Sequence, residues 1–512
     1  MTEERWKPLT VVVALLVVVG VAAAPTPASL TVAGKYAVAT MAFAAVLWVT
    51  GALPLPVTAL TVPVLLTVLG VYPTFGGAVA GFADPVVFLL LAGFVLAEAL
   101  GTHGIDRRIA LAVLVRFGTT PRRLVLGIMV ATAGLSMVVS NTATTAMMVP
   151  VVLGVVESVT DLTAADDPSG ASNFQVGALL GVAYAASLGG VGTLIGTPPN
   201  AIVVGQLQEL VGVRITFVEW LAVGLPMVAV TLPVAWALLT YVAYPPEGYD
   251  VERARDRARE QLASMGPLSS PARRTLAVFG ATVGLWFLGG LGFAFADVLP
   301  PVWQVTLFGG AGPNAVGTTG HQGVLFYVLV GLLAVPALVG SGAAAWEDLV
   351  DVDWGTLVLL GGGISLANAL ADTNATAWLA DVTFGALGGA PLVVVLFGVV
   401  SVTVLVGELA SNTAMAAILA PLLINVGPAY AAALGTSSEL AAVLLAVTGA
   451  IAASYGFALP VATPPNAVVF GAGHVERRHM LRAGALLDVV VVLLTTGVAY
   501  LLVRSLWPVV LG

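Results

Sequence analysis

Long apolar segments follow one another along almost the whole chain, separated by short polar stretches. Uninterrupted apolar runs of about 18 residues or more are typical of helices that cross a membrane. The pattern therefore predicts an all-α polytopic membrane protein with about 11 transmembrane helices. Ordinary spans are expected at residues 9–29, 36–54, 55–73, 84–100, 218–244, 273–298, 323–343, 353–370 and 483–508.

Four other apolar segments contain polar residues in the middle. Segments 124–156 and 391–425 are each interrupted by Ser-Asn-Thr, and their halves are shorter than the roughly 20 residues that a crossing needs, so they are predicted to be re-entrant hairpins. Segments 175–210 and 439–472 are each interrupted by Thr-Pro-Pro-Asn and are predicted to be broken helices. The interruptions are Ser140-Asn141-Thr142, Thr197-Pro198-Pro199-Asn200, Ser411-Asn412-Thr413 and Thr463-Pro464-Pro465-Asn466.

The two sets of polar interruptions have the same order and similar spacing, which indicates a duplicated transporter with its site between the copies. The acidic starts at Asp84 and Asp353 precede their Ser-Asn-Thr by nearly equal distances. Counting crossings from a cytoplasmic N-terminus places the first hairpin on the inner side and the second on the outer side. The copies are then inverted, the C-terminus is extracellular, and the arginine clusters near 107–123, 253–274 and 477–482 are cytoplasmic.

Composition narrows the class of protein further. The 512 residues are 59% hydrophobic and only 9% charged, against about 25% charged residues in soluble domains. The strand alternation of a porin-like barrel is missing from the sequence. The absence of cysteine excludes disulfides and thiolate metal sites. A net charge of −8 argues against nucleic acid as a partner and leaves the lipid bilayer as the expected environment.

The four interruptions also predict a chemistry. A helix that begins inside the membrane presents free N–H groups and a positive dipole end, which suit an anion. A helix that ends there offers free carbonyls, and these suit sodium together with Ser and Asn side-chain oxygens. Residues 124–212, 391–425 and 439–472 contain no Arg, Lys or His, so bound cations are expected to offset the charge of an anionic substrate.

Three stretches, residues 136–143, 189–200 and 453–469, resemble the divalent anion:sodium symporter family, which transports dicarboxylates, citrate and sulfate. The resemblance implies a homodimeric inverted-repeat elevator transporter, in which a transport domain moves across the membrane against a scaffold. The implied parts are a scaffold of spans 1–4 with an amphipathic helix (1–123), a first transport half (124–246), a cytoplasmic linker (247–274), scaffold spans 7–9 (275–388) and a second transport half (389–512).

The resemblance also implies site residues. One sodium ion is expected near Ser136, Ser140, Asn141 and Gly196, and a second near Gly407, Ala410, Asn412 and Ala462. Position 407 is glycine where some relatives have a hydroxyl residue, so a backbone carbonyl would have to serve there. The substrate carboxylates are expected at Asn141, Thr142, Thr197, Ser411, Asn412, Thr413, Thr463 and Pro464.

The favoured function is sodium-coupled symport of C4-dicarboxylates across the cell membrane, and not an enzymatic activity. Alternatives that keep the fold are a sodium-independent exchanger and a sodium-coupled sulfate or citrate transporter. An intramembrane hydrolase is disfavoured because the polar interruptions contain no His or Lys base. Glu408 has two interpretations, a coupling residue or a buried carboxylate that braces the second hairpin.

Overall fold

The computed structural model describes residues 3–117, 119–160, 172–246, 251–384, 390–434 and 436–505. The regular secondary structure of these residues is helical, and turns and loops join the helices. The one exception is an isolated bridge between Gly310 and His321, so the predicted all-α class is confirmed. Six of the described helices are long and apolar enough to cross a membrane, which supports the polytopic prediction. They are Val32–Thr50, Pro85–Thr102, Phe217–Ala243, Trp354–Asp372, Asn412–Tyr430 and Arg477–Leu501.

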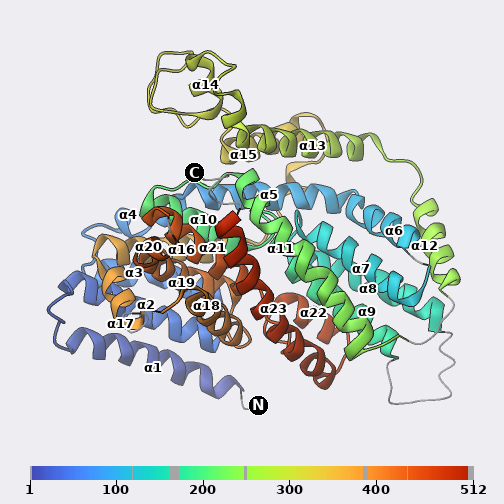
Figure 1. Ribbon diagram of the computed structural model, residues 1–512, viewed down its shortest axis with the longest axis horizontal. Helices are drawn as coiled ribbons and strands as arrows, with labels where there is room; N and C mark the ends of the chain where they lie inside the picture. Colours follow the sequence, from blue (N-terminus) through green and yellow to red (C-terminus); the bar gives the residue numbers. More distant parts are fainter. Residues whose placement is uncertain are drawn as a thin grey trace.

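The first half of the chain follows the predicted order of elements (Figure 1). Its early helices are α1 (Glu3–Ala23), α2 (Val32–Thr50), α3 (Leu55–Val68), α4 (Phe75–Ala78), α5 (Pro85–Thr102) and α6 (Ile105–Phe117). They are followed by α7 (Pro121–Ser136), α8 (Asn141–Thr160), α9 (Asn173–Gly190), α10 (Pro198–Val211) and α11 (Phe217–Ala237), which continues as a π-helical turn, Leu238–Ala243.

The second half begins after the linker helix α12 (Glu252–Ser264). It contains α13 (Ser270–Gly290), α14 (Pro301–Phe308), α15 (Tyr327–Gly340), α16 (Trp354–Asp372) and α17 (Ala375–Phe384). The remaining helices are α18 (Leu392–Gly407), α19 (Asn412–Val426), α20 (Ala431–Leu434), α21 (Ser438–Ala453), α22 (Pro464–Gly471) and α23 (Arg477–Ser505).

The two acidic starts read from the sequence are helix N-caps. The Asp84 carboxylate accepts from the backbone N–H of Val86 at 2.8 Å and begins α5. The Asp353 carboxylate accepts from the N–H of Thr356 at 2.9 Å and begins α16. An aspartate at this position satisfies a free N–H and stabilises the positive end of the helix.

Both predicted hairpins and both broken helices are present as pairs of helices. The Ser-Asn-Thr motifs lie where α7 gives way to α8 and where α18 gives way to α19. The Thr-Pro-Pro motifs begin α10 and α22, each after a helix-free stretch that follows α9 or α21. In both motifs proline occupies the first helical position, where its missing N–H is not needed.

Helix packing pairs the two halves reciprocally. Within each half, the hairpin packs on the helix before the break, α7 and α8 on α9, and α18 and α19 on α21. Across the halves, α10 packs on α19 and α21, while its counterpart α22 packs on α8 and α9. The early helices follow the same rule, since α3 packs on α16 and α15 on α5. Each half therefore completes the other.

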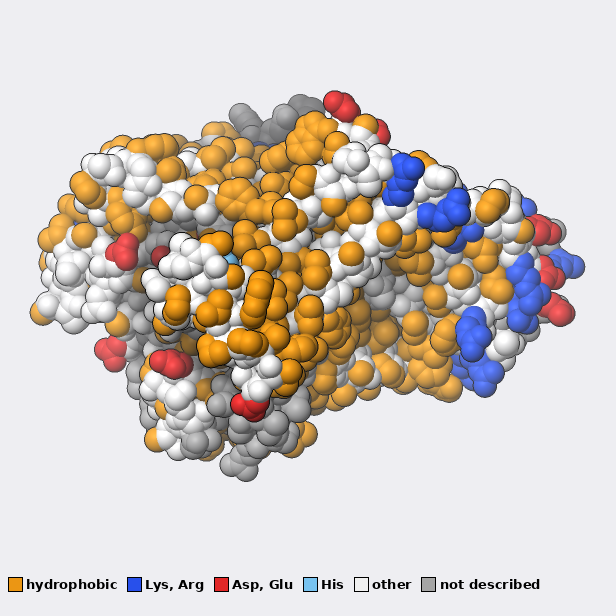
Figure 2. All heavy atoms as spheres, turned by 90° about the horizontal axis from the view of Figure 1, so that it is seen from above, with side chains coloured by type: hydrophobic (Ala, Val, Ile, Leu, Met, Phe, Trp, Pro, Cys, Tyr) orange, Lys and Arg blue, Asp and Glu red, His pale blue; other side chains and the backbone are white. Residues whose placement is uncertain are grey.

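Two of the arginine clusters lie against each other. Arg108 of α6 donates to the carbonyl of Gly266 at 2.7 Å, and Arg255 of α12 donates to that of Val115 at 2.9 Å. Figure 2 shows Lys and Arg side chains gathered at one end of the molecule, where Figure 1 places α6 and α12, beside a face dominated by hydrophobic side chains. The clusters therefore belong to one polar end.

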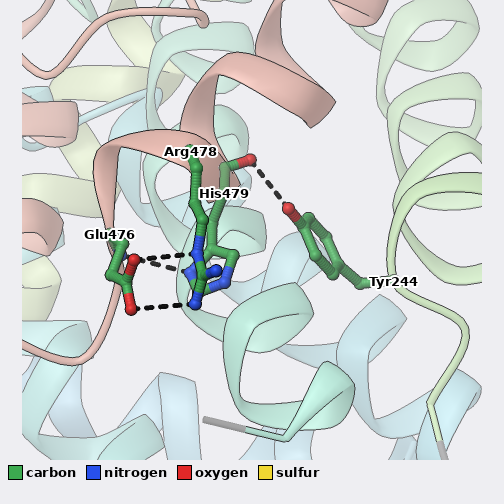
Figure 3. Close-up of polar contacts among 4 residues, drawn as sticks. All are labelled: Tyr244, Glu476, Arg478 and His479. Carbon is green, nitrogen blue, oxygen red and sulfur yellow. Dashed lines mark hydrogen bonds and ion pairs between the residues drawn. The ribbon is translucent and has the colours of Figure 1, made fainter. Parts of the chain in front are cut away.

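The third arginine cluster, at the start of α23, contacts the end of α11 (Figure 3). The Tyr244 hydroxyl donates to the carbonyl of His479 at 3.0 Å, and the guanidinium of Arg482 lies over the Tyr244 ring. Arg478 pairs with Glu476 at 2.8 Å. The first cluster reaches the same region, because Arg122 donates to the carbonyl of Thr240. All three clusters are thus connected through contacts between their helices.

Some boundaries differ from the prediction. The last helix begins at Arg477 rather than 483, and α8 extends to Thr160. The short helices α14 and α17 were not predicted, because each is too short to produce a clear hydrophobic period. The predicted linker residues 247–250, the scaffold end at 385–388 and the chain end at 506–512 lie outside the described residues.

Glycine allows helices α7 and α9 to pack closely. A Cβ atom on Gly189 would lie 2.4 Å from the carbonyl oxygen of Ala133, a backbone atom of α7. Neither backbone can move without separating α7 from α9.

We predict that Gly189→Val lowers the free energy of unfolding of the detergent-solubilised protein by about 1–3 kcal/mol, the usual range for overpacking. Gly134→Val on α7 is the control, because a Cβ there meets nothing within 4 Å. Thermal unfolding followed by size-exclusion chromatography measures the difference. Equal melting temperatures for the two variants would contradict the packing argument.

Candidate functional site

The tip of the first hairpin is built around Asn141, the first residue of α8. Its amide NH₂ group donates to Ser136 Oγ at 2.6 Å and lies 3.2 Å from the carbonyl oxygens of Ala186 and Gly196. The Ser136 hydroxyl is also 2.8 Å from the carbonyl of Ala186. The structure therefore brings together three of the predicted sodium residues: Ser136, Asn141 and Gly196.

Two glycines permit this close approach. A Cβ on Gly190 would lie 2.4 Å from the Asn141 side chain, and a Cβ on Gly196 would lie 3.0 Å from the carbonyl oxygen of Ser136. Only glycine fits where a backbone lies directly against a hairpin tip. The carbonyl-rich loop between α9 and α10 is thus in contact with the first hairpin.

That loop, residues 191–197, is held by side-chain donors. Asn200, fully buried, donates from Nδ2 to the carbonyls of Gly190 at 3.1 Å and Thr193 at 2.7 Å. The indole N–H of Trp220 donates to the carbonyl of Val191 at 3.0 Å. The Thr193 hydroxyl donates to the carbonyl of Met137 in the hairpin tip.

The loop between α21 and α22, residues 454–463, repeats this arrangement. Asn466 donates to the carbonyls of Gly456 at 3.1 Å and Leu459 at 2.9 Å. The Tyr184 hydroxyl donates to the carbonyl of Phe457 at 3.1 Å. Each asparagine therefore binds the carbonyls ten and seven residues before it, and an aromatic donor binds the carbonyl nine residues before it.

Glu408 joins the second hairpin tip to this loop. Its carboxyl oxygens accept from the backbone N–H groups of Ala458 at 3.0 Å and Leu459 at 2.8 Å. Asp488 of α23 accepts from the N–H of Phe457 at 3.2 Å and is hydrogen-bonded to Glu408. Glu408 is buried and hydrogen-bonded to the loop, which agrees with the interpretation as a bracing carboxylate.

Two of the predicted residues of the second sodium site, Gly407 and Ala462, lie close to each other. A Cβ on Gly456 would lie 3.1 Å from the Cβ of Ala462 and 3.7 Å from the carbonyl oxygen of Gly407. Ala410 is buried at the same tip. The Oδ1 atom of Asn412 is buried without a hydrogen-bond partner among the described residues. A buried oxygen of this kind fits the predicted role as a cation ligand.

The helix caps agree with the sequence except at one position. Ser140 accepts from the N–H of Ala143 and Ser411 from that of Ala414, so both Ser-Asn-Thr motifs cap the helix that follows. Thr463 accepts from the N–H of Asn466, directly before Pro464. Thr197, at the corresponding position before α10, makes no such bond.

The first hairpin tip also borders a cavity of about 360 Å³. Ser140, Thr142 and Ala143 form one wall of it. The opposite wall comes from α5, α6 and the stretch before α16, and it is acidic: Glu98, Asp106, Asp351 and Asp353. Asp106 lies in the first turn of the amphipathic helix α6, outside the predicted membrane spans. Burial raises the pKa of its carboxyl group.

Chemically, the site offers hydroxyls, amides, carbonyl oxygens and helix N-termini. Such a set suits a hard cation at the carbonyl loops and an anion at the starts of α8, α10, α19 and α22. The hydrogen bonds given above involve no Arg, Lys or His side chain in either loop or tip. Positive charge for an anion must then come from helix ends and bound cations.

Comparison with known proteins agrees with this chemistry. The model of the family described as "Sodium:sulfate symporter transmembrane region" matches residues 3–511. The chain belongs to this family. Members of it are transporters, so this membrane protein is a transporter and not an enzyme.

Several relatives have names that state a function. The chain is 32% identical to the sodium-dependent dicarboxylate transporter SdcS of Staphylococcus saprophyticus, over 95% of this chain and 88% of the relative. It is 30% identical to the SdcS protein of Staphylococcus aureus strain USA300, with the same coverage. An uncharacterized transporter of Haemophilus influenzae is 35% identical over 90% of each chain.

Among solved structures, the fold is similar to that of the YdaH transporter of Alcanivorax borkumensis. The TM-score is 0.50 at 18% identity, with 85% of this chain and 89% of that chain covered. At this identity the likeness concerns the fold alone.

Sequence reasoning missed the residues that hold the loops. Asn200 and Asn466 were read as part of the Thr-Pro-Pro-Asn motifs without a role of their own, and Thr193, Trp220, Tyr184 and Asp488 were not singled out. The repetition of asparagine at the same place in both motifs was the available signal. The donors on other helices gave no signal, because only the fold brings them to the loops.

We predict that Glu408→Gln loosens the second hairpin tip. Glutamine keeps one acceptor oxygen and turns an NH₂ group towards a backbone N–H, at a cost of about 1–3 kcal/mol for a buried unsatisfied donor. Substrate uptake should fall at least tenfold, about 1.4 kcal/mol in the same terms. Glu439→Gln, near the start of α21, is the control. Unchanged uptake and melting temperature in Glu408→Gln would contradict the bracing role.

Proposed function

We propose that this protein is a sodium-coupled symporter of C4-dicarboxylates such as succinate, malate and fumarate. The observation that carries the proposal is the matched pair of sites. Each hairpin tip lies against a carbonyl-rich loop, and the residues of both are uncharged apart from Glu408. Homologues named as sodium-dependent dicarboxylate transporters support the same reading.

The two Ser-Asn-Thr tips are proposed to bind the two ends of the substrate. Asn141 and Thr142 would contact one carboxylate, and Ser411, Asn412 and Thr413 the other. Each motif begins a helix, so free N–H groups are available for a carboxylate at each tip. Thr197, Thr463 and Pro464, at the starts of α10 and α22, are proposed to complete the pocket.

Sodium is proposed to bind between each tip and its loop. The first ion would use oxygens of Ser136, Ser140, Asn141 and Gly196, and the second those of Gly407, Ala410, Asn412 and Ala462. At Gly407, which has no side chain, a backbone carbonyl would serve. Because these oxygens include few charges, ion affinity depends on the anion nearby, which couples the two bindings.

The mechanism is proposed to be an elevator in a homodimer in the cell membrane. The scaffold would be residues 1–123 and 275–388, and the transport halves 124–246 and 389–512. The reciprocal contacts of α10 and α22 support two inverted copies that move as one body. The common polar end of the three arginine clusters supports a cytoplasmic N-terminus and an extracellular C-terminus.

A sodium gradient should drive uptake. Protein in liposomes is expected to accumulate labelled succinate only when sodium is higher outside, because the cations supply the positive charge that the site lacks. Replacing external sodium with potassium is the control. Uptake that persists unchanged in potassium, or that requires internal dicarboxylate instead, would favour the exchanger and sink the symport proposal.

Asn141→Ala and Asn412→Ala should each reduce succinate uptake at least a hundredfold, since each removes an amide proposed to serve both an ion and the substrate. A loss of that size corresponds to about 2.7 kcal/mol. Asn425→Ala on α19 is a matched control, because its amide donates only within the helix, to the carbonyl of Pro421. Wild-type rates in both tip variants would discard the site.

Substrate class is tested by competition. Unlabelled succinate, malate and fumarate are expected to compete with labelled succinate in sodium buffer, and sulfate and citrate to compete weakly. Two anion-binding tips favour a substrate with two separated carboxylates. Stronger competition by sulfate or citrate would replace the dicarboxylate with that anion while leaving sodium coupling intact.

A further inference from the structure

Both carbonyl loops are held from inside by an asparagine that no part of the proposed site includes. Asn200 and Asn466 occupy the third position of α10 and α22, and both are fully buried. The NH₂ group of each donates to two backbone carbonyls. Asn200 donates to Gly190, the last residue of α9, at 3.1 Å and to Thr193 at 2.7 Å. Asn466 donates to Gly456 at 3.1 Å and to Leu459 at 2.9 Å.

The side-chain amide oxygens of the two asparagines accept no such hydrogen bonds. Asn200 Oδ1 and Asn466 Oδ1 are buried without a hydrogen-bond partner among the described residues. An unpaired buried acceptor is costly, at about 1–3 kcal/mol in proteins generally. Retaining it at the same position in both halves indicates that the NH₂ end is what each loop requires.

The carbonyls so held border the proposed ion sites. Gly190, whose carbonyl Asn200 binds, lies directly against the Asn141 side chain. Gly196, at the other end of the same loop, lies against the carbonyls of Gly190 and Ser136. In the second half, Gly456 is held by Asn466 and lies near Ala462, Glu408 and Gly407. Fixing the loop therefore fixes the distance between loop and tip.

We propose that Asn200 and Asn466 are positioning residues that set the sodium affinity of the first and second ion sites. The inference rests on the proposed sodium coupling. Without the NH₂ donor, the carbonyls of Gly190 and Gly456 lose the side-chain donor that holds them. The carbonyls of Thr193 and Leu459 keep only a bond from a backbone N–H of their own loop. The oxygens around the ion then lose their fixed spacing. Sodium must then order the loop as it binds, which weakens its binding but leaves the substrate contacts intact once the ion is bound.

The test uses Asn200→Asp and Asn466→Asp, which keep the size of the side chain but replace the NH₂ donor, and the corresponding alanine variants. Gln206→Leu is the matched control, because Gln206 is a buried amide on α10 that donates to the carbonyl of Ala417 and not to the loop. Sodium activation of succinate uptake is measured in liposomes, and the succinate KM is measured at saturating sodium. Independently of transport, the rise in melting temperature on replacing potassium with sodium is measured without substrate.

Each asparagine variant is expected to raise the half-saturating sodium concentration about tenfold, the lower end of effects seen for residues that orient metal ligands. The sodium-dependent rise in melting temperature should become smaller in the same variants. The succinate KM at saturating sodium should stay within about twofold of wild type, which is well below a tenfold change. Gln206→Leu should lower the melting temperature in both salts with an unchanged sodium midpoint.

A wild-type half-saturating sodium concentration in both aspartate variants would overturn the inference. An equal rise in the half-saturating sodium concentration and in the succinate KM would also overturn it, because it indicates general damage to the fold. If the aspartate forms do not fold, the alanine forms decide by the same two criteria. Failure of the proposed function gives a different result, because wild-type protein itself would then show no response to sodium in uptake or melting temperature.

Discussion

A helix that stops away from water must find partners for the backbone groups it leaves free, and this requirement governs the centre of the protein. Helices α9 and α21 stop before α10 and α22 begin, and the loops between them contain carbonyls and N–H groups with no helical partner. The chain meets the requirement with side chains: Asn200, Trp220 and Thr193 in one half, and Asn466, Tyr184, Glu408 and Asp488 in the other. Side chains from other helices therefore fix the loops against which the hairpin tips lie.

The two halves solve the same problem with different chemistry. In the first, the Thr193 side chain of the loop donates to the backbone of the hairpin tip. In the second, the Glu408 side chain of the tip accepts from the backbone of the loop. One connection is neutral and the other involves a carboxyl group, so the two hairpins are held to their loops with unequal strength. Two hairpins with the same motif and corresponding neighbours are therefore held to their loops in different ways.

Much of this architecture was readable from the sequence, because its signals are local. Apolar length predicted the helices, and Ser-Asn-Thr and Thr-Pro-Pro predicted the interruptions, since capping residues and proline act within one helical turn. Asp84 and Asp353 were recognisable as helix starts for the same reason. The residues that hold the loops were not readable, because Trp220 and Tyr184 donate from other helices and look like ordinary apolar positions. Thr197 and Thr463 precede the same Pro-Pro-Asn, yet only Thr463 caps its helix, because a residue type suited to capping does not fix its hydroxyl orientation.

The reciprocal packing of α10 and α22 has a consequence for dividing the protein. A chain with only one half would leave α10 without α19 and α21, and α22 would have no α8 or α9 to pack on. Neither half can bury its own apolar helices, so neither is expected to fold as an independent domain.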